Sequence, residues 1–494
     1  MNVAGARGAV TGAVVPGVVV SGVVVCGVVV AGLVVAGLVD VAPVVDVGAA
    51  VEPGAAVDAM ADAVTDDAAD FESLEHAGAS RARSTGAAMT KRDGRMKRSL
   101  APALVVRSHQ KTGVSRHLMA ASERSGGRMV DVTLDLMLED LAALVQIESP
   151  SRDLEALAVS ADALATMIAA RTGRAAQLIE TTAGPIVHWS GGGDPQVLII
   201  GHHDTVHPLG SLAERPFTVA DGRATGPGVF DMKAGIVQAI HAVAALDDAR
   251  GVEMLFSPDE EVGSRASRAL IEERAIACGA VLVLEPSADG GALKIARKGL
   301  GTFEVFIHGR AAHAGLEPEK GINALIEAAH QILAIASFAD PEIGTTVTPT
   351  VARAGTTDNV VPALAHLYID VRVEAEGEKE RIENSMALLT PRDTQTRIEV
   401  AGGITRPPMP SLASATLFPL AIAVAQELGL AAVQGRAVGG GSDGNFTAAR
   451  GVATLDGLGA VGGGAHADHE YVDVATMPDR VRLLTGLIAA IRAS

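Results

Sequence analysis

The chain has 494 residues, a length that suggests about two to four domains and allows a large buried core. Apolar residues make up 48% of the sequence and charged residues 20%, which excludes a wholly disordered chain. Acidic residues outnumber basic residues 58 to 40, and the formal charge of -18 argues against a protein that binds duplex nucleic acid. Cys26 and Cys278 are too few for a disulfide framework and form no C-x-x-C pair, so we expect a reducing compartment.

The first 128 residues differ in composition from the rest of the chain. Residues 1–128 hold 13 basic and 12 acidic residues, whereas residues 129–494 hold 27 and 46, so the net negative charge belongs to the second part. The charges of the first part form blocks, acidic over 40–75 and mostly basic over 81–128. Blocks of like charge repel one another and seldom fold, so we expect a low-complexity extension over 1–128.

An uncharged run over Gly8–Val39 carries glycine at every fifth position from Gly17 to Gly37. Its length would suffice for a membrane span, which needs about 20 apolar residues. However, this spacing does not place the glycines on one face of a helix, and each glycine weakens the helix. We favour an extension outside the working protein, with a membrane anchor and a disordered tail as alternatives. We therefore expect Met129 to be the true start.

The sequence after Met129 is typical of an α/β domain. Apolar residues recur at helical spacing over 131–148, 153–171 and 233–246. Short apolar runs over 196–201, 252–257 and 280–285 predict strands buried on both faces of a parallel sheet. Strand and helix patterns return after residue 407. Residues 129–297 and 407–494 are thus predicted to form one catalytic domain, a mostly parallel sheet layered with helices.

Residues 298–406 follow a different pattern. It predicts strands over 303–308, 346–353, 366–373 and 396–401, with helices over 323–337 and 378–389. The resulting order, β-α-β-β-α-β, is that of a ferredoxin-like unit. We therefore expect a small domain that interrupts the larger one.

Residues able to bind metal ions follow the predicted buried strands. His202 follows the first strand, Glu261 the second and Glu285 the third, while Asp231 and His466 lie in loops. The carboxyl ends of strands in an open α/β sheet are where ligands bind. Three carboxylates gathered there repel one another unless cations join them, and with two imidazoles they suit zinc or a similar divalent ion. If one carboxylate bridges, the five residues can hold two cations.

The motifs around these residues resemble those of a known family. They are H-x-D-x-V from His202, G-x-G-x-x-D-x-K ending at Lys233, D-E-E-x-G from Asp259 and H-x-x-x-E from His466. The set is similar to that of the co-catalytic zinc amidohydrolases and peptidases, which include glutamate carboxypeptidase, acetylornithine deacetylase and succinyl-diaminopimelate desuccinylase. The resemblance covers 129–494 and leaves out the first 128 residues.

The resemblance implies a ligand set. His202 and Glu285 would hold one zinc ion, Glu261 and His466 would hold the other, and Asp231 would bridge them. His469 also lies close to these positions, but we prefer His466 for its four-residue spacing to Glu470. Cobalt or manganese would suit the same ligands, so the metal itself stays open.

The resemblance also implies roles in proton transfer and substrate binding. Asp204 would orient His202, and Glu260 would be the general base that takes a proton from water. In the family the inserted domain mediates dimerisation, one of its histidines reaches the neighbouring subunit's site, and asparagine and arginine residues hold the substrate carboxylate. The matching positions are His313, Asn359, Arg372 and Arg406. An arginine fork can bind both carboxylate oxygens, although a salt bridge on its own strand is the alternative for Arg372.

These features favour a di-zinc hydrolase that cleaves an amide bond next to a free carboxylate and releases a C-terminal amino acid, as glutamate carboxypeptidase does. An N-acyl-amino-acid deacylase of the acetylornithine deacetylase or desuccinylase type is the alternative, followed by a metal-binding relative without turnover. The presence of Glu260 favours an enzyme, since a non-catalytic relative needs no base beside its metals. We expect a cytoplasmic homodimer that acts on a peptide or an N-acyl amino acid, with no nucleic-acid partner and no membrane.

A chain that begins at Met129 should fold and be as active as the full-length chain, because every motif lies after that residue. The intact mass of the natively expressed protein should show a product that starts near Met129. A membrane-bound product that retains Gly8–Val39 would contradict this expectation.

Overall fold

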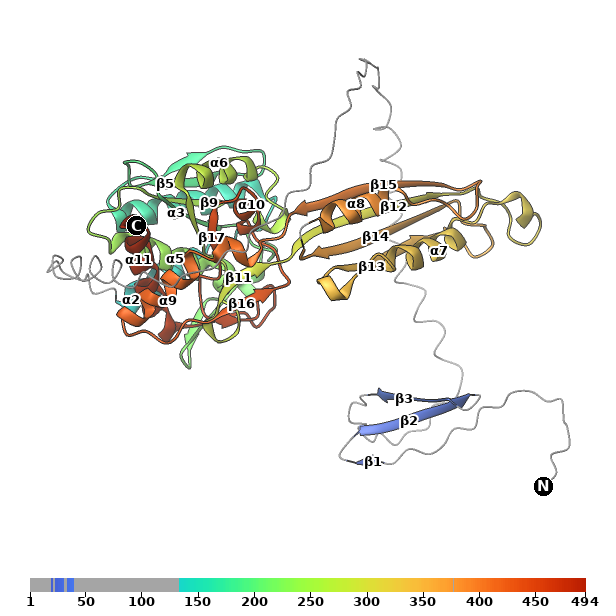
Figure 1. The fold of residues 1–494 in the computed structure, drawn as a ribbon, viewed down its shortest axis with the longest axis horizontal. Helices are drawn as coiled ribbons and strands as arrows, with labels where there is room; N and C mark the ends of the chain where they lie inside the picture. The colour runs from blue at the N-terminus through green and yellow to red at the C-terminus, as the bar shows by residue number, and fades with distance from the viewer. Residues whose placement is uncertain (1–18, 21–22, 31–32, 40–132, 376) are drawn as a thin grey trace, which may run out of the picture. The chain divides into compact units, whose positions relative to one another are not determined.

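The computed structural model describes residues 19–20, 23–30, 33–39, 133–375 and 377–494 (Figure 1). The chain divides into two units, Met1–Val105 and Val106–Ser494. The charge blocks over 40–75 and 81–128 and the expected start at Met129 lie outside the described residues.

The described part of the first unit is an antiparallel sheet. Its strands are β1 (Val19–Val20), β2 (Val23–Val30) and β3 (Leu33–Val39), in that order. The apolar run is thus extended rather than helical where it is described. Among the described segments, no helix is long and apolar enough to cross a membrane.

The second unit is built around a six-stranded sheet in the order β17-β10-β6-β9-β5-β4. The strands are β4 (Gln177–Ile179), β5 (Ile186–Ser190), β6 (Val197–His202), β9 (Val252–Ser257), β10 (Ala280–Val283) and β17 (Ala453–Leu455). The first four in the sheet order run parallel, and β5 and β4 add an antiparallel edge. The mostly parallel sheet is confirmed. The sequence does not predict the antiparallel edge, because its strands are short and lack a clear alternation.

Helices cover both faces of this main sheet. They are α2 (Leu134–Val145), α3 (Leu154–Thr172), α5 (Ala234–Ala244), α6 (Arg268–Cys278), α9 (Leu417–Glu427) and α11 (Met477–Arg492), with the shorter α4 (Ser211–Glu214) and α10 (Gly444–Ala449). Val197 and Ile199 of β6 belong to the core that includes α5 and α11, whereas Leu198 and Ile200 face the core that includes α6. Alternate side chains of one strand therefore fill opposite layers.

Smaller sheets surround the main one. Strands β18 (Gly462–Gly463), β19 (Tyr471–Asp473), β8 (Arg223–Thr225) and β7 (Thr218–Ala220) form a second sheet in that order. Strand β11 (Leu293–Arg297) pairs in parallel with β16 (Gly435–Val438). These pairings join residues before and after the inserted segment.

The inserted domain has a sheet and a core of its own. Its elements are β12 (Gly299–His308), α7 (Ala324–Ala336), β13 (Thr346–Ala354), β14 (Leu364–Val373), α8 (Glu378–Ala387) and β15 (Arg397–Arg406). The antiparallel order β13-β14-β12-β15 is that of a ferredoxin-like sheet, with α7 and α8 packed on one face (Figure 1). The separate core supports the domain boundaries that we propose, 129–297, 298–406 and 407–494.

Strand β15 continues past the predicted end at residue 401. Gly402 and Gly403 suggest a break in the sequence, yet both pair with β12. A Cβ atom at Gly402 would collide with the carbonyl oxygen of Thr302, so the close approach of the two strands requires glycine there. The longer strand carries Arg406 back to the main sheet.

Asp140 on α2 joins three helices through one buried carboxylate. Arg171 of α3 donates to it through Nε at 2.7 Å and Nη2 at 2.6 Å, and His241 of α5 through Nε2 at 2.8 Å. Burial raises the pKa of Asp140, but the hydrogen bonds from His241 and Arg171 outweigh burial and lower this pKa below its ordinary value.

Asp140→Asn should lower the free energy of unfolding at pH 7 by about 1.5–3 kcal/mol, the usual contribution of hydrogen bonds to a charged group. Because the pKa is lower in the folded than in the unfolded chain, the carboxylate stabilises the fold above the unfolded value of about 3.9, and this contribution is lost as pH falls through the folded pKa. Urea unfolding of both proteins should therefore show a gap that narrows below about pH 4. Equal stability at pH 7 would contradict the assignment.

Candidate metal centre

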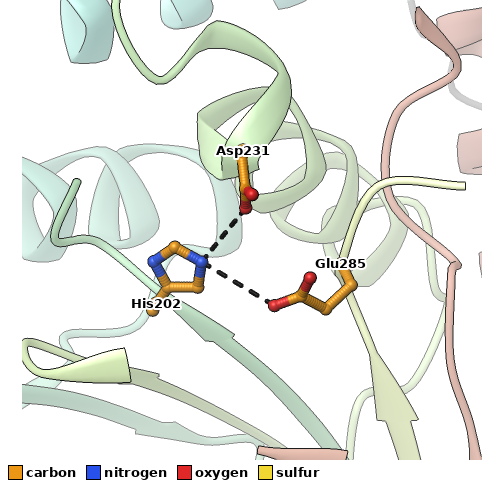
Figure 2. A group of neighbouring side chains, drawn as sticks. All are labelled: His202, Asp231 and Glu285. Carbon is orange, nitrogen blue, oxygen red and sulfur yellow. Dashed lines mark hydrogen bonds and ion pairs between the residues drawn. The ribbon is translucent and has the colours of Figure 1, made fainter. Parts of the chain in front are cut away.

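Five side chains meet at the carboxyl end of the main sheet, in two groups that share Asp231. The first group is His202, Asp231 and Glu285 (Figure 2), and the second is Asp231, Glu261 and His466. His202 Nε2 lies 3.2 Å from Asp231 Oδ1 and 3.8 Å from Glu285 Oε1. His466 Nε2 lies 3.3 Å from Asp231 Oδ2 and 3.1 Å from Glu261 Oε1. Asp231 therefore turns one oxygen toward each group.

Positive charge is favoured between these carboxylates. Burial lowers the pKa of His202, but hydrogen bonds to Asp204 and Asp231 outweigh it and raise this pKa well above its usual value. Hydrogen bonds to Asp231 and Glu261 raise the pKa of His466 to about 10. Burial, followed by the charge of Asp231, raises the pKa of Glu285 to about 7. The raised pKa values mean that protonation of this cluster is favoured. Bound cations would compensate the negative charge of the carboxylates in the same way.

The donor chemistry of both groups fits divalent cations. In each group the ligand atoms lie within 4.8 Å of one another, and imidazole with carboxylate is a ligand set that zinc accepts. His202 is only 1% exposed, whereas the side chain of His466 is 51% exposed. The first group is therefore enclosed and the second is open to solvent, as a site that admits a substrate requires.

A tight turn after β9 lets two neighbouring glutamates face the same place. Glu260–Val262 forms a single turn of 3-10 helix instead of continuing the strand. Consecutive side chains of a strand would point to opposite faces. In the turn, Glu261 reaches His466 while Glu260 lies buried beside the centre.

Asp204 supports the site through more contacts than the sequence predicts. His202 Nδ1 lies 2.9 Å from the Asp204 backbone oxygen and 3.4 Å from its Oδ1. The same carboxylate accepts hydrogen bonds from the backbone N–H groups of Glu260 at 3.1 Å and Glu261 at 3.2 Å, and from Ser151 Oγ at 2.7 Å. Asp204 thus orients His202 and also holds the turn that carries both glutamates.

The guanidinium group of Arg406 is bound by other residues of the chain and is not free to face a substrate. Its Nη1 pairs with Glu260 Oε1, and its Nη2 donates to the Glu260 carbonyl at 2.9 Å and to Ser264 Oγ at 2.9 Å. Nη2 also lies 3.3 Å from Asp443 Oδ1. The side chain is buried, so this fork is committed to the protein. Burial raises the pKa of Glu260 to about 8, although the charge of Arg406 opposes this shift.

The other expected residues of the inserted domain lie apart from the ligand groups. Arg372 forms a bidentate pair with Asp370 of its own strand, with both distances 2.9 Å, which is the alternative that the sequence left open. His313 and Asn359 are exposed and adjacent, because the Ala314 N–H donates to the Asn359 carbonyl at 2.8 Å. They lie beyond the end of β12 that is farther from the main sheet.

Two further buried residues contact the centre. Arg297 is buried and donates to Asp456 through Nε at 2.7 Å and to Glu285 Oε2 through Nη2 at 3.3 Å. Glu470 is buried and accepts a hydrogen bond from the backbone of Asp231 at 2.8 Å. The H-x-x-x-E spacing pointed to Glu470, whereas nothing local marks Arg297.

A family model described as peptidase family M20/M25/M40 matches residues 198–490. The chain is 32% identical over 373 residues to carboxypeptidase G2 of Pseudomonas sp. (strain RS-16), covering 71% of this chain and 88% of the relative. It is 29% identical over 199 residues to succinyl-diaminopimelate desuccinylase 2 of Shewanella loihica, covering 36% of this chain and 52% of the relative.

The fold is similar to a solved structure described as an M20 family metallo-carboxypeptidase, Sso-CP2 from Sulfolobus solfataricus. The TM-score is 0.60 at 17% sequence identity, and the match covers 72% of this chain and 99% of that one. The match extends over the whole of that protein and thus includes the inserted domain as well as the main sheet.

A matched pair of substitutions should separate metal binding from proton transfer. Glu260→Gln keeps an oxygen for Arg406, so it should retain the metal content of the parent while reducing turnover by a factor of about 10²–10⁴. Glu261→Gln should lose metal from the second group. Atomic emission and turnover measured on both variants decide the roles. Metal loss in Glu260→Gln, or full activity, would reverse them.

Proposed function

The chain belongs to peptidase family M20/M25/M40 and is a carboxypeptidase-like hydrolase, and from this premise we propose that it is a di-zinc enzyme that releases a C-terminal amino acid. The substrate would be a peptide or an N-acyl amino acid cut at the amide bond next to its free carboxylate. The observation that carries the proposal is Asp231, which turns one oxygen toward each of two ligand groups beside a buried glutamate.

The two ligand groups would each hold one divalent cation. His202 and Glu285 would serve the enclosed site, Glu261 and His466 the open one, and Asp231 would bridge. When bound, such ions lower the pKa of water and polarise the amide carbonyl. Zinc suits the mixed imidazole and carboxylate donors, and cobalt or manganese would fit the same set.

Glu260 would move the proton. Its free oxygen takes a proton from water as the water oxygen bonds to the amide carbon, and it returns that proton to the nitrogen as the C–N bond breaks. The products are a carboxylic acid and an amine. Arg406 grips the other oxygen and the backbone carbonyl of Glu260, so we assign Arg406 to holding this base in place.

The substrate carboxylate would be held by residues of the inserted domain. Arg372 is half-buried and its pairing with Asp370 is confined to its own strand, so exchange for a substrate carboxylate requires no backbone movement. Asn359 and His313 lie in two adjacent exposed loops, one before β14 and one after β12. Strand β12 has 10 residues and spans about 33 Å, which places both loops too far from the centre of their own subunit.

A homodimer would bring the loops of His313 and Asn359 to a neighbouring centre. Helix α7 exposes Leu325, Ile326 and Leu333 by 50%, 59% and 72%, an apolar surface that favours a protein partner. Strand β13 lies at the edge of its sheet and can pair with a second copy. We propose that these surfaces form the dimer and that His313 acts on the partner's substrate.

We also propose a cytoplasmic location. Cys278 is a buried free thiol. Burial raises its pKa to about 12, so it stays protonated and unreactive at neutral pH. This agrees with a reducing compartment.

Paired substrates test the activity. Dipeptides and N-acyl amino acids should be hydrolysed by the zinc-loaded enzyme, whereas the same compounds with an amidated C-terminus should react far more slowly. Equal rates on both would overturn the carboxylate requirement. The similarity to a desuccinylase makes a deacylase the second candidate, and faster cleavage of N-succinyl than of peptidyl substrates would favour it.

Mixing two inactive variants tests the role of His313 across the dimer. Glu260→Gln and His313→Ala should each be inactive, but a mixed dimer pairs an intact base with an intact histidine from the partner. With random exchange of subunits, about a quarter of the parental activity should return. No return of activity after demonstrated exchange would exclude the role in the partner.

A further inference from the structure

We propose that Glu470 is a positioning residue. It anchors the loop of Asp231 to the loop of His466 and so holds these two proposed metal ligands in fixed positions relative to each other. The inference rests on the proposed function, because it concerns the same metal centre. It gives a task to the last position of the H-x-x-x-E motif, for which the mechanism above has no use.

Both oxygens of the Glu470 carboxylate are occupied by hydrogen bonds from this chain. Oε1 accepts hydrogen bonds from the backbone N–H of Phe230 at 2.7 Å and of Asp231 at 2.8 Å. Oε2 accepts from the N–H of Gly228 at 2.9 Å and faces His207 Nε2 at 3.0 Å. A carboxylate accepts about four hydrogen bonds, and Glu470 is 2% exposed, so it has no capacity left for a cation. Its contacts mark it as an anchor and not as a ligand.

The backbone at Asp231 needs such an anchor. Asp231 has φ -114° and ψ 92°, which lie outside the helical region, although the residue lies within the turn Val229–Lys233 just before α5. Its N–H therefore lacks the partner that a regular helix supplies. Glu470 supplies it instead, so the direction in which the Asp231 side chain leaves the backbone depends on this carboxylate.

The proton position on His207 follows from its two neighbours. Arg215 Nη2 donates toward His207 Nδ1 at 3.3 Å, so Nδ1 is the acceptor and the proton resides on Nε2, which donates to Glu470. Arg215 Nη1 also pairs with Asp468 at 3.2 Å. Arg215 thus braces the loop between His466 and Glu470 from outside.

The two ligand loops become one unit through these contacts. Glu470 follows His466 by four residues, and the connecting loop is closed by the Glu470 N–H donating to the Ala467 carbonyl at 3.2 Å. Strand β19 then pairs with β8, just before the Asp231 loop. The 3.3 Å approach of His466 Nε2 to Asp231 Oδ2 is therefore set by backbone that Glu470 holds. Metal affinity of the second group should depend on Glu470 without direct contact.

Glu470→Gln provides the test, with Asp140→Asn as its matched control. Each substitution exchanges a buried carboxylate for an amide of the same shape. The Asp140 side chain bonds Arg171 and His241 and forms no hydrogen bond with the loops of Asp231 and His466. A glutamine NH₂ cannot accept from the Gly228 N–H. Zinc affinity, measured by competition with a chelator, should fall about 10–100-fold in Glu470→Gln, as expected for residues that orient ligands, and should stay at the parental value in Asp140→Asn.

Hydrogen exchange on the metal-free chain gives a second readout. The amides of Gly228, Phe230 and Asp231 should be protected in the parent and in Asp140→Asn, and should exchange faster in Glu470→Gln. Parental zinc affinity together with parental protection in Glu470→Gln would overturn the proposal. If this variant does not fold, Glu470→Asp, which keeps the charge on a shorter side chain, should show the same two losses, and parental values there would overturn the proposal equally.

The proposal and the proposed function fail in different ways. A parent chain that binds two zinc ions but cleaves no substrate would refute the function and leave the anchor intact. A parent chain that cleaves its substrate, with Glu470→Gln binding zinc equally well, would refute the anchor alone.

Discussion

Three carboxylates are concentrated at one end of the main sheet, and the contacts of the surrounding loops serve to hold them there. Asp231, Glu261 and Glu285 meet within reach of two histidines. Like charges so placed repel one another unless positive charge lies between them. The neighbouring carboxylates raise the pKa of His466, which favours its positive form, and Asp231 lies in both ligand groups. The first group, around His202, is enclosed by protein, whereas the second group, around His466, is accessible from solvent.

The proposed ligands are held in place through their backbone as well as their side chains. The Asp204 carboxylate binds the N–H groups of the turn that carries Glu260 and Glu261, and the Glu470 carboxylate binds those of the loop that carries Asp231. Arg297 holds a third residue of the site by donating a hydrogen bond to the Glu285 side chain. Two buried acids therefore serve as acceptors for loops that leave regular secondary structure. The side chains at the site can therefore be held in fixed positions although the loops that carry them are not part of long helices or strands.

The inserted domain is tied to the same centre at the points where the chain enters and leaves it. Asn445 Nδ2 donates to the carbonyl of Lys298 at 3.1 Å and to that of Pro407 at 2.7 Å, one on each crossing segment. Gly441 lies so close to Leu300 that a Cβ atom would collide with it. Arg406, at the end of β15, extends this connection to Glu260. The position of the inserted domain is thus linked mechanically to the proposed base.

The sequence alone predicts the α/β architecture, the ferredoxin-like insertion and the candidate ligand residues, because each leaves a local pattern. Buried strands appear as short apolar runs and helices as periodic ones, and His202, Glu261 and Glu285 lie at or just after the ends of those runs. The ends of β15 and the antiparallel edge strands were less visible, since glycines and short strands carry little periodicity.

The partners of the charged side chains depended on folding. Arg406 lies 146 residues from Glu260 in the sequence, and Glu470 lies 239 residues from Asp231. No local pattern can report such pairings, because they arise where separate loops converge at the ends of strands. The resemblance implies a substrate-binding role for Arg406, and the sequence gives no sign of the contacts that Arg406 makes with Glu260 and Ser264 in the folded chain. The sequence therefore indicates the candidate ligands through their side-chain chemistry, and it also indicates Asp204 and Glu470 through their motifs. The backbone N–H groups that Asp204 and Glu470 bind depend on the three-dimensional arrangement of the loops, which only the folded chain determines.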